Sequence, residues 1–285
     1  LPALVGMVHL APLPGSPQFG GSMDWVVDDS LTRARQLVEA GFPALMVENF
    51  GDVPFYADDV PPVTIASITR CVSQIATEVS VPIGVNVLRN DGLAAVAIAG
   101  VTGAAMLRVN VLSGLMQTDQ GPIVGRAAEV VRHRREVAPD AQIWADVMVK
   151  HASPPPGLTL EQSADDTWHR GGADALVLSG AGTGHAPDLA SFRRVRATVA
   201  DAPLVVGSGA TLDIGCGPGR MARALAETGQ ITLGIDVVPE AVAQTRGRGA
   251  SALQRDVFAD VPAEGRWQTV LLAGGRIGIG GDPVA

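Results

Sequence analysis

Acidic and basic side chains recur along the first two thirds of this chain, each placed just after a short apolar run. Asp146 is followed closely by Lys150 and His151. An acid with two potential bases at this spacing suits proton transfer, because histidine works near neutral pH with little tuning. Glu48 and His9 end two other apolar runs. We therefore predict acid–base catalysis by Asp146, Lys150, His151, Glu48 and His9.

A second set of residues suits the binding of an anion. Arg89 and Arg108 could fork onto a phosphate or a carboxylate. Glycine-rich stretches after two later apolar runs could offer backbone N–H groups to a phosphate. These features predict a small phosphorylated ligand. The residues predicted to bind it are Asn86, Arg89, Arg108, Asn110, Ser179, Gly180, Gly182, Thr183, Gly184, Gly207, Ser208 and Gly209.

The elements that must position these residues are short strands alternating with amphipathic helices. Strands are predicted at 3–10, 44–48, 82–88, 105–111, 142–149, 175–179 and 203–207, and helices at 28–40, 64–79, 92–100, 122–137, 159–170 and 188–199. Apolar strands in this rhythm indicate a parallel sheet covered by helices. Polar residues or glycines follow nearly every strand. This favours a (β/α)8 TIM barrel, in which strand ends meet at one mouth, over a doubly wound sheet.

Structural alternatives exist for several of these residues. The glycines could form ordinary turns. Arg108 could be a buried partner of Glu48 or Asp146 that holds the mouth together, and His9 could satisfy a backbone carbonyl. A mouth containing His, Asp and Glu could also bind a metal. No His-x-His or similar ligand spacing occurs, so no metal site is predicted.

The sequence pattern changes near Thr211. Residues 1–210 supply seven predicted strands, which is a barrel without its last βα unit, and residues 211–285 form a second predicted domain. That domain begins with TLDIGCGPGR at 211–220, a strand that runs into a glycine turn, and continues with strands at 231–237, 252–254 and 269–273. Adjacent parallel strands need a crossover of about a dozen residues. The strands on either side of residues 208–210 therefore cannot be neighbours in one sheet.

Residues 1–210 resemble the BtpA/SgcQ family of TIM-barrel proteins. The stretches that carry the resemblance are GMVHLAPLPGSP at 6–17, GFPALMVENFGDVPF at 41–55, GVNVLRND at 84–91, RVNVL at 108–112, TDQG at 118–121, ADVMVKHA at 145–152 and SGAGTG at 179–184. The resemblance implies a TIM barrel and, through the founding member, a link to photosystem I biogenesis. The family's reaction is poorly defined. A non-catalytic assembly factor for a membrane complex is therefore an alternative to an enzyme.

Residues 211–285 resemble the N-terminal half of class I S-adenosylmethionine-dependent methyltransferases. LDIGCGPG at 212–219 and LGID at 233–236 carry the resemblance, which implies S-adenosylmethionine as cofactor. In such a site Asp213 would meet the methionyl amine, Asp236 the ribose hydroxyls and Asp256 the adenine. The residues expected to bind the cofactor are Asp213, Gly215, Gly217, Gly219, Asp236 and Asp256. The chain departs from the family pattern in two ways: it has AGGR at 273–276, and strands five to seven of the family's sheet are missing. The alternative to a cofactor site is that the glycines form an ordinary turn.

Three hypotheses account for two incomplete domains. The C-terminal half-domain covers the open barrel, a partner chain completes it, or the sequence joins two unrelated reading frames, which makes it chimeric. The third hypothesis is favoured, because no Pro/Ser-rich linker separates the two segments.

The composition narrows the classes of partner and compartment. With 21 basic and 29 acidic residues the net charge is −8, which argues against nucleic acid and anionic membranes as partners. Cys71 and Cys216 are isolated, so neither a disulfide framework nor a zinc cluster is expected. We find no membrane-spanning run and no signal peptide, and expect a cytoplasmic protein. The sequence leaves a homo-oligomer open.

Overall fold

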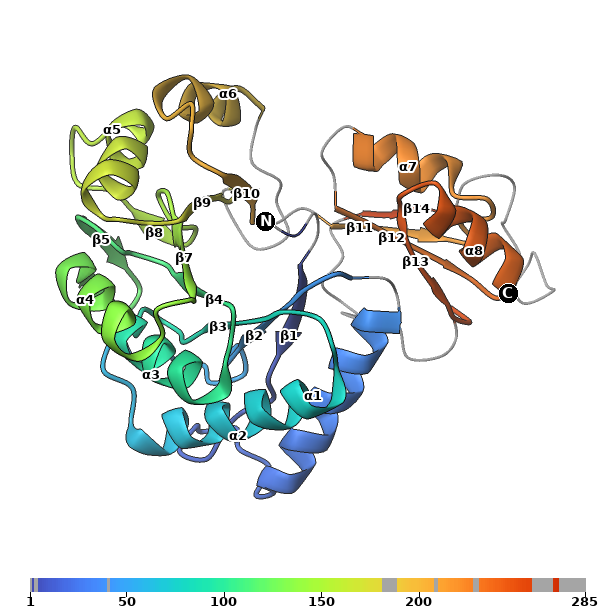
Figure 1. Ribbon diagram of the computed structural model, residues 1–285, viewed down its shortest axis with the longest axis horizontal. Helices are drawn as coiled ribbons and strands as arrows, with labels where there is room; N and C mark the ends of the chain where they lie inside the picture. The colour runs from blue at the N-terminus through green and yellow to red at the C-terminus, as the bar shows by residue number, and fades with distance from the viewer. Residues whose placement is uncertain are drawn as a thin grey trace.

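A computed structural model describes residues 2, 5–39, 42–180, 189–207, 210–227, 231–257 and 269–271. The first part of the chain forms a curled sheet with helices on its outer face (Figure 1). Its strands, in spatial order, are β1 (Gly6–His9), β2 (Leu45–Glu48), β3 (Ile83–Asn86), β4 (Met106–Val109), β7 (Gln142–Asp146), β9 (Ala175–Leu178) and β10 (Leu204–Val206). All neighbours are parallel. The predicted seven-stranded, incomplete barrel is confirmed, and among the described residues its ladder ends at β1 and β10.

Helices connect these strands and cover the sheet. They are α1 (Met23–Glu39), α2 (Pro62–Glu78), α3 (Gly92–Thr102), α4 (Ala127–Val137), α5 (Leu160–Asp165), the π-helical turn η1 (Asp166–Arg170) and α6 (Leu189–Thr198). The side chain of Asp91 caps α3 by accepting a hydrogen bond from the Ala94 amide, and Gly103 ends the helix with φ 73°. Thr159 and Gln162 form a capping box at the start of α5. Local sequence signals thus fix where the crossovers begin and end.

Alternate residues of each barrel strand point to opposite faces, which produces two apolar layers. The larger one lies between sheet and helices and contains Val47, Val85, Ile68 and Leu107. The smaller one fills the barrel interior and includes Met46, Met106, Trp144, Ala175 and Val177, together with the partly buried Met7 and Val205. The interior is therefore a packed apolar floor beneath the strand ends.

Gly84 of β3 makes room for this floor. A Cβ atom at Gly84 would lie 2.5 Å from Cγ of Met106 and 2.7 Å from Cε of Met46. The two methionine side chains cross the place that a side chain at position 84 would occupy. A glycine here is thus required by the packing of the interior.

A small antiparallel sheet, which we call the accessory sheet, was not predicted. It consists of β5 (Leu115–Thr118), β6 (Gly121–Val124) and β8 (Ala152–Ser153). The helix predicted at 122–137 begins only at Ala127, because Gly121 turns the chain with φ 94° and Pro122 and Ile123 extend it into β6. The sheet has its own core of Val111, Met116, Ile123 and Val149.

The second part of the chain forms a separate four-stranded parallel sheet, ordered β13-β12-β11-β14 (Figure 1). Its elements are β11 (Ala210–Ile214), α7 (Arg220–Glu227), β12 (Ile231–Asp236), α8 (Pro239–Gly247), β13 (Ser251–Gln254) and β14 (Thr269–Leu271). β10 and β11 belong to different sheets, as the short connection requires. Among the described residues, no helix is both long and apolar enough to span a membrane.

Candidate functional site

Residues at or next to the carboxyl ends of four barrel strands lie side by side at the same level. His9 is in register with Glu48, Glu48 with Asn86, and Asn86 with Arg108. Paired residues of parallel strands share a face, and these lie two positions beyond the interior methionines. They therefore form a polar ring above the apolar floor, which Asp146 at the end of β7 extends. We call these five residues the barrel mouth.

His9 and Glu48 lie on one side of the barrel mouth. Nε2 of His9 is 3.6 Å from Oε1 of Glu48, and the His9 ring stacks on Phe50 with centroids 4.6 Å apart. Asn86 donates from Nδ2 to Oε2 of Glu48 at 2.6 Å. Glu48 is thus held between a histidine that can carry a proton and an amide that cannot, which is an arrangement suited to proton transfer.

Arg108 and Asp146 form a buried ion pair across β4 and β7. Arg108 donates from Nε and Nη2 at 3.0–3.2 Å, and Asn110 donates to the same carboxylate at 2.7 Å. Burial lowers the pKa of the Arg108 guanidinium, but the charges of Asp146 and Glu48 outweigh it, so the pKa is raised overall. Asp146 is therefore engaged by two side chains. This geometry matches the alternative in which Arg108 holds the mouth together.

Arg89 and Lys150 bring two more cations to the barrel mouth. Arg89 is only 7% exposed, and its Nη2 donates to the backbone carbonyl of Lys150 at 2.7 Å. Burial lowers the pKa of the Lys150 ammonium, and so do the charges of Arg108 and Arg89, while Glu48 and Asp146 act in the opposite direction. Burial also lowers the pKa of Arg89. Within the described residues neither cation forms an ion pair with a carboxylate.

The backbone around Lys150 is bent in an unusual way. Met148 and His151 have φ values of 51° and 56°, a left-handed conformation that non-glycine residues rarely adopt. Between them, Val149 is 2% exposed in the core of the accessory sheet. Strained residues of this kind persist where surrounding packing fixes them, and they cluster at functional sites. The accessory sheet thus anchors the segment that presents Lys150.

His151 lies at the exposed rim of this segment. Burial lowers its pKa, as do the charges of Lys150 and Arg89, whereas Asp119 raises it. Asp119 follows Thr118, which pairs with Ala152 in the accessory sheet, so the antiparallel register brings it opposite His151. Asp119 and the stacking residue Phe50 were missed from the sequence. The signal for Asp119 was a polar turn between two short alternating runs.

The predicted phosphate-binding glycines are described only in part. Oγ of Ser179 is buried, and among the described residues it has no hydrogen-bond partner. A Cβ atom at Gly207 would collide with this hydroxyl, so the ends of β9 and β10 lie in contact. Gly180 follows Ser179 in a half-buried position. The remaining predicted residues lie outside the described part of the chain: Gly182, Thr183, Gly184, Ser208 and Gly209.

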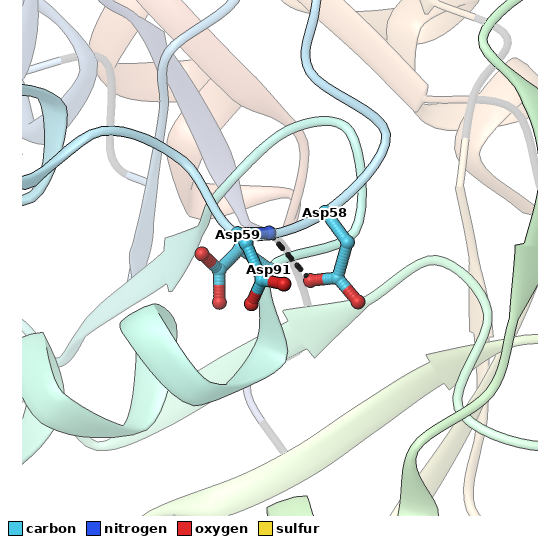
Figure 2. A group of neighbouring side chains, drawn as sticks. All are labelled: Asp58, Asp59 and Asp91. Atoms are coloured by element: carbon cyan, nitrogen blue, oxygen red, sulfur yellow. Dashed lines mark hydrogen bonds between the residues drawn. The ribbon is translucent and has the colours of Figure 1, made fainter.

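Three carboxylates gather away from the barrel mouth, at Asp58, Asp59 and Asp91 (Figure 2). Arg126 lies 3.4 Å from Asp58 and 3.0 Å from Asp59. Asp91 accepts hydrogen bonds from the amides of Val60 and Ala94 at 2.9 and 2.8 Å. Burial raises the pKa of Asp58, and the charge of Asp91 adds to this. A counter-ion and backbone donors already account for the cluster.

The glycine turn of the second sheet, residues 215–219, lies beside Asp236. Gly215, Gly217 and Gly219 adopt left-handed φ values of 62°, 54° and 74°. Asp236 accepts from the amide of Gly217 at 2.9 Å and from that of Val238 at 3.0 Å. The motif thus brings the turn and the acid together.

The other predicted cofactor residues lie around the same turn. Asp213 is buried at the end of β11, and Asp256 is exposed just after β13. Thr245 of α8 donates from Oγ1 to the carbonyl of Gly217 at 2.9 Å. A Cβ atom at Gly219 would lie 2.6 Å from the Thr245 side chain, so the turn packs closely against α8.

Comparisons with known proteins divide the chain at a similar place. Residues 211–278 match the family described as a methyltransferase domain. A dihydropteroate synthetase crystal structure is 14% identical, with a TM-score of 0.46 over 88% of this chain and 86% of that one.

Relatives of the first part come from bacteria and archaea. The photosystem I biogenesis protein BtpA of Synechocystis sp. is 42% identical over 74% of this chain and 73% of its own length. An uncharacterized Thermococcus kodakarensis protein is 47% identical over 74% and 79%. The putative sgc region protein SgcQ of Escherichia coli is 30% identical over 74% and 79%. Residues 2–214 match the BtpA family itself, and this chain belongs to that family.

Proposed function

We propose that the chain binds a small phosphorylated molecule at the barrel mouth. The observation that carries this proposal is the excess of buried positive charge. Arg89, Arg108 and Lys150 face two buried carboxylates, Glu48 and Asp146, and the ion pair of Arg108 with Asp146 uses one of these. Asp146, Glu48 and the exposed Asp119 attract Arg89, and Glu48 and Asp146 attract Lys150, but among the described residues none of these carboxylates forms an ion pair with either cation. A phosphate would supply the missing negative charge.

The energetic reason lies in the burial of these cations. Removing a charged group from water costs several kcal/mol, roughly, unless a partner compensates it. The lowered pKa values of Lys150 and Arg89 are the sign of this cost, because burial disfavours their protonated forms. An anion that enters the mouth removes the penalty. The low-dielectric walls of the barrel also strengthen its attraction to the guanidinium of Arg89.

The same proposal includes acid–base chemistry on the bound ligand. We assign the proton transfer to Glu48, which has His9 beside it at 3.6 Å, and to Lys150, whose pKa is lowered by burial. His151 would contribute from the rim. Asp146 would act by orienting Arg108 and Asn110, since its oxygens already accept their hydrogen bonds. The reaction class that fits is proton abstraction or donation next to the anionic group.

Calorimetric titration tests the binding proposal. The probes are inorganic phosphate and glycerol 3-phosphate, each titrated into the whole chain. Arg89→Met should weaken binding at least tenfold, because a hydrogen bond to a charged group contributes about 1.5–3 kcal/mol. Arg70→Met is the matched control, since Arg70 is an exposed arginine of α2 that pairs with Asp24. No heat at millimolar probe, or equal loss in both variants, would refute the proposal.

A second candidate function is methyl transfer from S-adenosylmethionine. The observation in its favour is the hydrogen bond from the Gly217 amide to Asp236, which is the residue expected to bind ribose. Asp213, Asp236 and Asp256 would hold the cofactor, which supplies the methyl group when bound. Titration with S-adenosylhomocysteine tests this. Heat that disappears in Asp236→Ala would support it, and no heat would remove it.

A third candidate is a non-catalytic assembly factor. The relative named photosystem I biogenesis protein, 42% identical, favours it. Such a factor would need partner proteins but no small ligand at the mouth. Co-purification of the chain with a membrane complex, unaffected by Arg89→Met, would support this candidate over ligand binding.

A further inference from the structure

Lys150 is the single lysine of the chain. The other 20 of its 21 lysine and arginine residues are arginines. These include Arg89 and Arg108, the two other cations at the mouth. Arginine stays protonated and is a poor nucleophile, whereas a buried lysine readily loses its proton and can attack a carbonyl. The one position that departs from arginine therefore lies where an amine can do chemistry.

The surroundings of Lys150 suit a reactive amine. The side chain is half-buried, and among the described residues its ammonium makes no ion pair. Two guanidinium groups, Arg108 and Arg89, act on it from within the same mouth. A neighbouring cation and desolvation are the two means by which proteins activate a lysine for attack on carbonyl compounds.

The backbone of Lys150 is held in place from both sides. Arg89 donates to its carbonyl oxygen at 2.7 Å, and Val149 is buried in the core of the accessory sheet. The left-handed residues Met148 and His151 flank this pair. The segment thus contains two strained residues next to Lys150, and the exposure of a lysine at the surface would not require such strain.

We propose that Lys150 is a nucleophile that forms an imine with an anionic aldehyde or ketone bound at the barrel mouth. The inference rests on the proposed function, because the anionic group of the substrate would bind Arg89 while its carbonyl carbon meets the amine. It goes further in naming the substrate class and a covalent intermediate. The lowered pKa of Lys150 supports it, since a larger fraction of the amine is unprotonated near neutral pH.

The chemistry balances without any oxidant or reductant. The lone pair of the unprotonated Nζ forms a bond to the carbonyl carbon while the C=O π pair moves to the oxygen; the nitrogen then loses one proton and the oxygen gains one, which gives a neutral carbinolamine. A second proton transfer to that oxygen releases water, and the C–N bond becomes a C=N bond. Glu48 and His9, 3.6 Å apart on the neighbouring strands β1 and β2, are the groups that would move these protons. The protonated imine withdraws electrons from the adjacent carbon, and water reverses the steps.

Reductive trapping tests the proposal directly. The full chain is incubated with sodium cyanoborohydride and either pyruvate or dihydroxyacetone phosphate, and modified peptides are located by mass spectrometry. A single lysine makes the assignment unambiguous, because the only other amine is the N-terminus. We expect one adduct per chain at Lys150 and none in Lys150→Arg. An absent adduct, or one confined to the N-terminal amine, would overturn the proposal.

A relocated lysine provides the matched control. The double variant Lys150→Arg/Arg135→Lys keeps the number of amines and places the lysine on the exposed face of α4. Trapping of wild-type Lys150 near neutral pH should be at least about tenfold faster than trapping of this exposed lysine. Equal rates would show that Lys150 reacts as any lysine does, which would overturn the inference.

Competition separates this proposal from the one on which it rests. Excess inorganic phosphate should slow trapping by dihydroxyacetone phosphate, since both would bind Arg89. Phosphate binding by calorimetry without an adduct at Lys150 would overturn the imine and leave the anion site intact. If an adduct formed at Lys150 at the same rate with and without phosphate, the result would support Lys150 as the nucleophile and refute the anion site.

Discussion

The barrel mouth and the glycine turn of the second sheet both lie at the carboxyl edge of parallel strands, yet their polar groups are paired differently. In the turn, the carboxylate of Asp236 accepts hydrogen bonds from the chain's own amides at Gly217 and Val238. In the mouth, Arg89 and Lys150 have no carboxylate of their own among the described residues. The turn is hydrogen-bonded within its own domain, whereas the mouth leaves two cations without an ion-pair partner among the described residues.

The difference bears on which site depends on a ligand. Thr245 packs into the glycine turn and bonds to it, so the turn is held by its own domain. The mouth is held by the ion pair of Arg108 with Asp146 and by Asn86 on Glu48, while its remaining cations are destabilised by burial. A paired scaffold that carries cations without an ion-pair partner is what the proposed anion binding would use.

The largest expected effect comes from breaking the scaffold of the mouth. Arg108→Met leaves the Asp146 carboxylate buried without its counter-ion and should lower the free energy of unfolding by about 3–5 kcal/mol. Asp236→Asn in the turn should cost only about 1–2 kcal/mol, because the amide oxygen still accepts one backbone hydrogen bond. Urea unfolding measures both losses, and hydrogen exchange assigns each one to its sheet.

A double variant controls for the loss of packing. Arg108→Met/Asp146→Leu removes both charges and should recover most of the stability that Arg108→Met loses. If Arg108→Met cost no more than Asp236→Asn, the two sites would not differ in the way that their contacts indicate.

A smaller effect tests how tightly the glycine turn is closed. Gly219→Ala places a Cβ atom 2.6 Å from the Thr245 side chain at φ 74°. Left-handed strain of about 1 kcal/mol and overpacking of about 1–2 kcal/mol should add. Gly249→Ala is the matched control, with φ 81° and no atom within 4 Å, and should show the strain alone. Equal shifts in melting temperature would indicate a turn with free space.

Much of the barrel could be predicted because its strands are apolar on both faces. Runs such as those around Leu45–Glu48 and Ile83–Asn86 are fully buried, and the last residue of each is polar. Since parallel strands end at one edge, this alone brings Glu48 and Asn86 together. The strands predicted for the second sheet also lie close to those of the structure, because the glycine motif marks the end of β11.

The rest could not be predicted because it depends on tertiary contacts. The accessory sheet has strands too short to separate from a helix start by periodicity. Its strand β8 pairs with β5 although residues 119–151 lie between them in the chain. From the sequence alone, either Glu48 or Asp146 could pair with Arg108. The structure shows that β4 pairs with β7, which brings Arg108 to Asp146. The left-handed turn at Met148 ends a strand that the apolar pattern extended to 149.

The smallest expected effect concerns the charge of Lys150 itself. Its pKa in the folded chain lies below the usual 10.5, so in the pH range between the two values the unfolded chain binds more protons. Stability therefore rises with pH across that range. Lys150→Met lacks this penalty and should be slightly more stable than wild type at pH 7, by less than about 1 kcal/mol because the side chain is only half-buried. The gain should shrink as the pH approaches 10.5.

Lys150→Arg is the control for that pH dependence, because its guanidinium keeps its charge throughout the range. The stability difference between wild type and Lys150→Arg should grow in favour of wild type as the pH rises, since only the amine can shed the buried charge. Urea unfolding at several pH values between 7 and about 10 measures both curves. If the difference in unfolding free energy did not change with pH, the folded chain would hold the charged Lys150 side chain at no cost relative to water. The contrast between the mouth and the glycine turn would then depend on Arg89 alone.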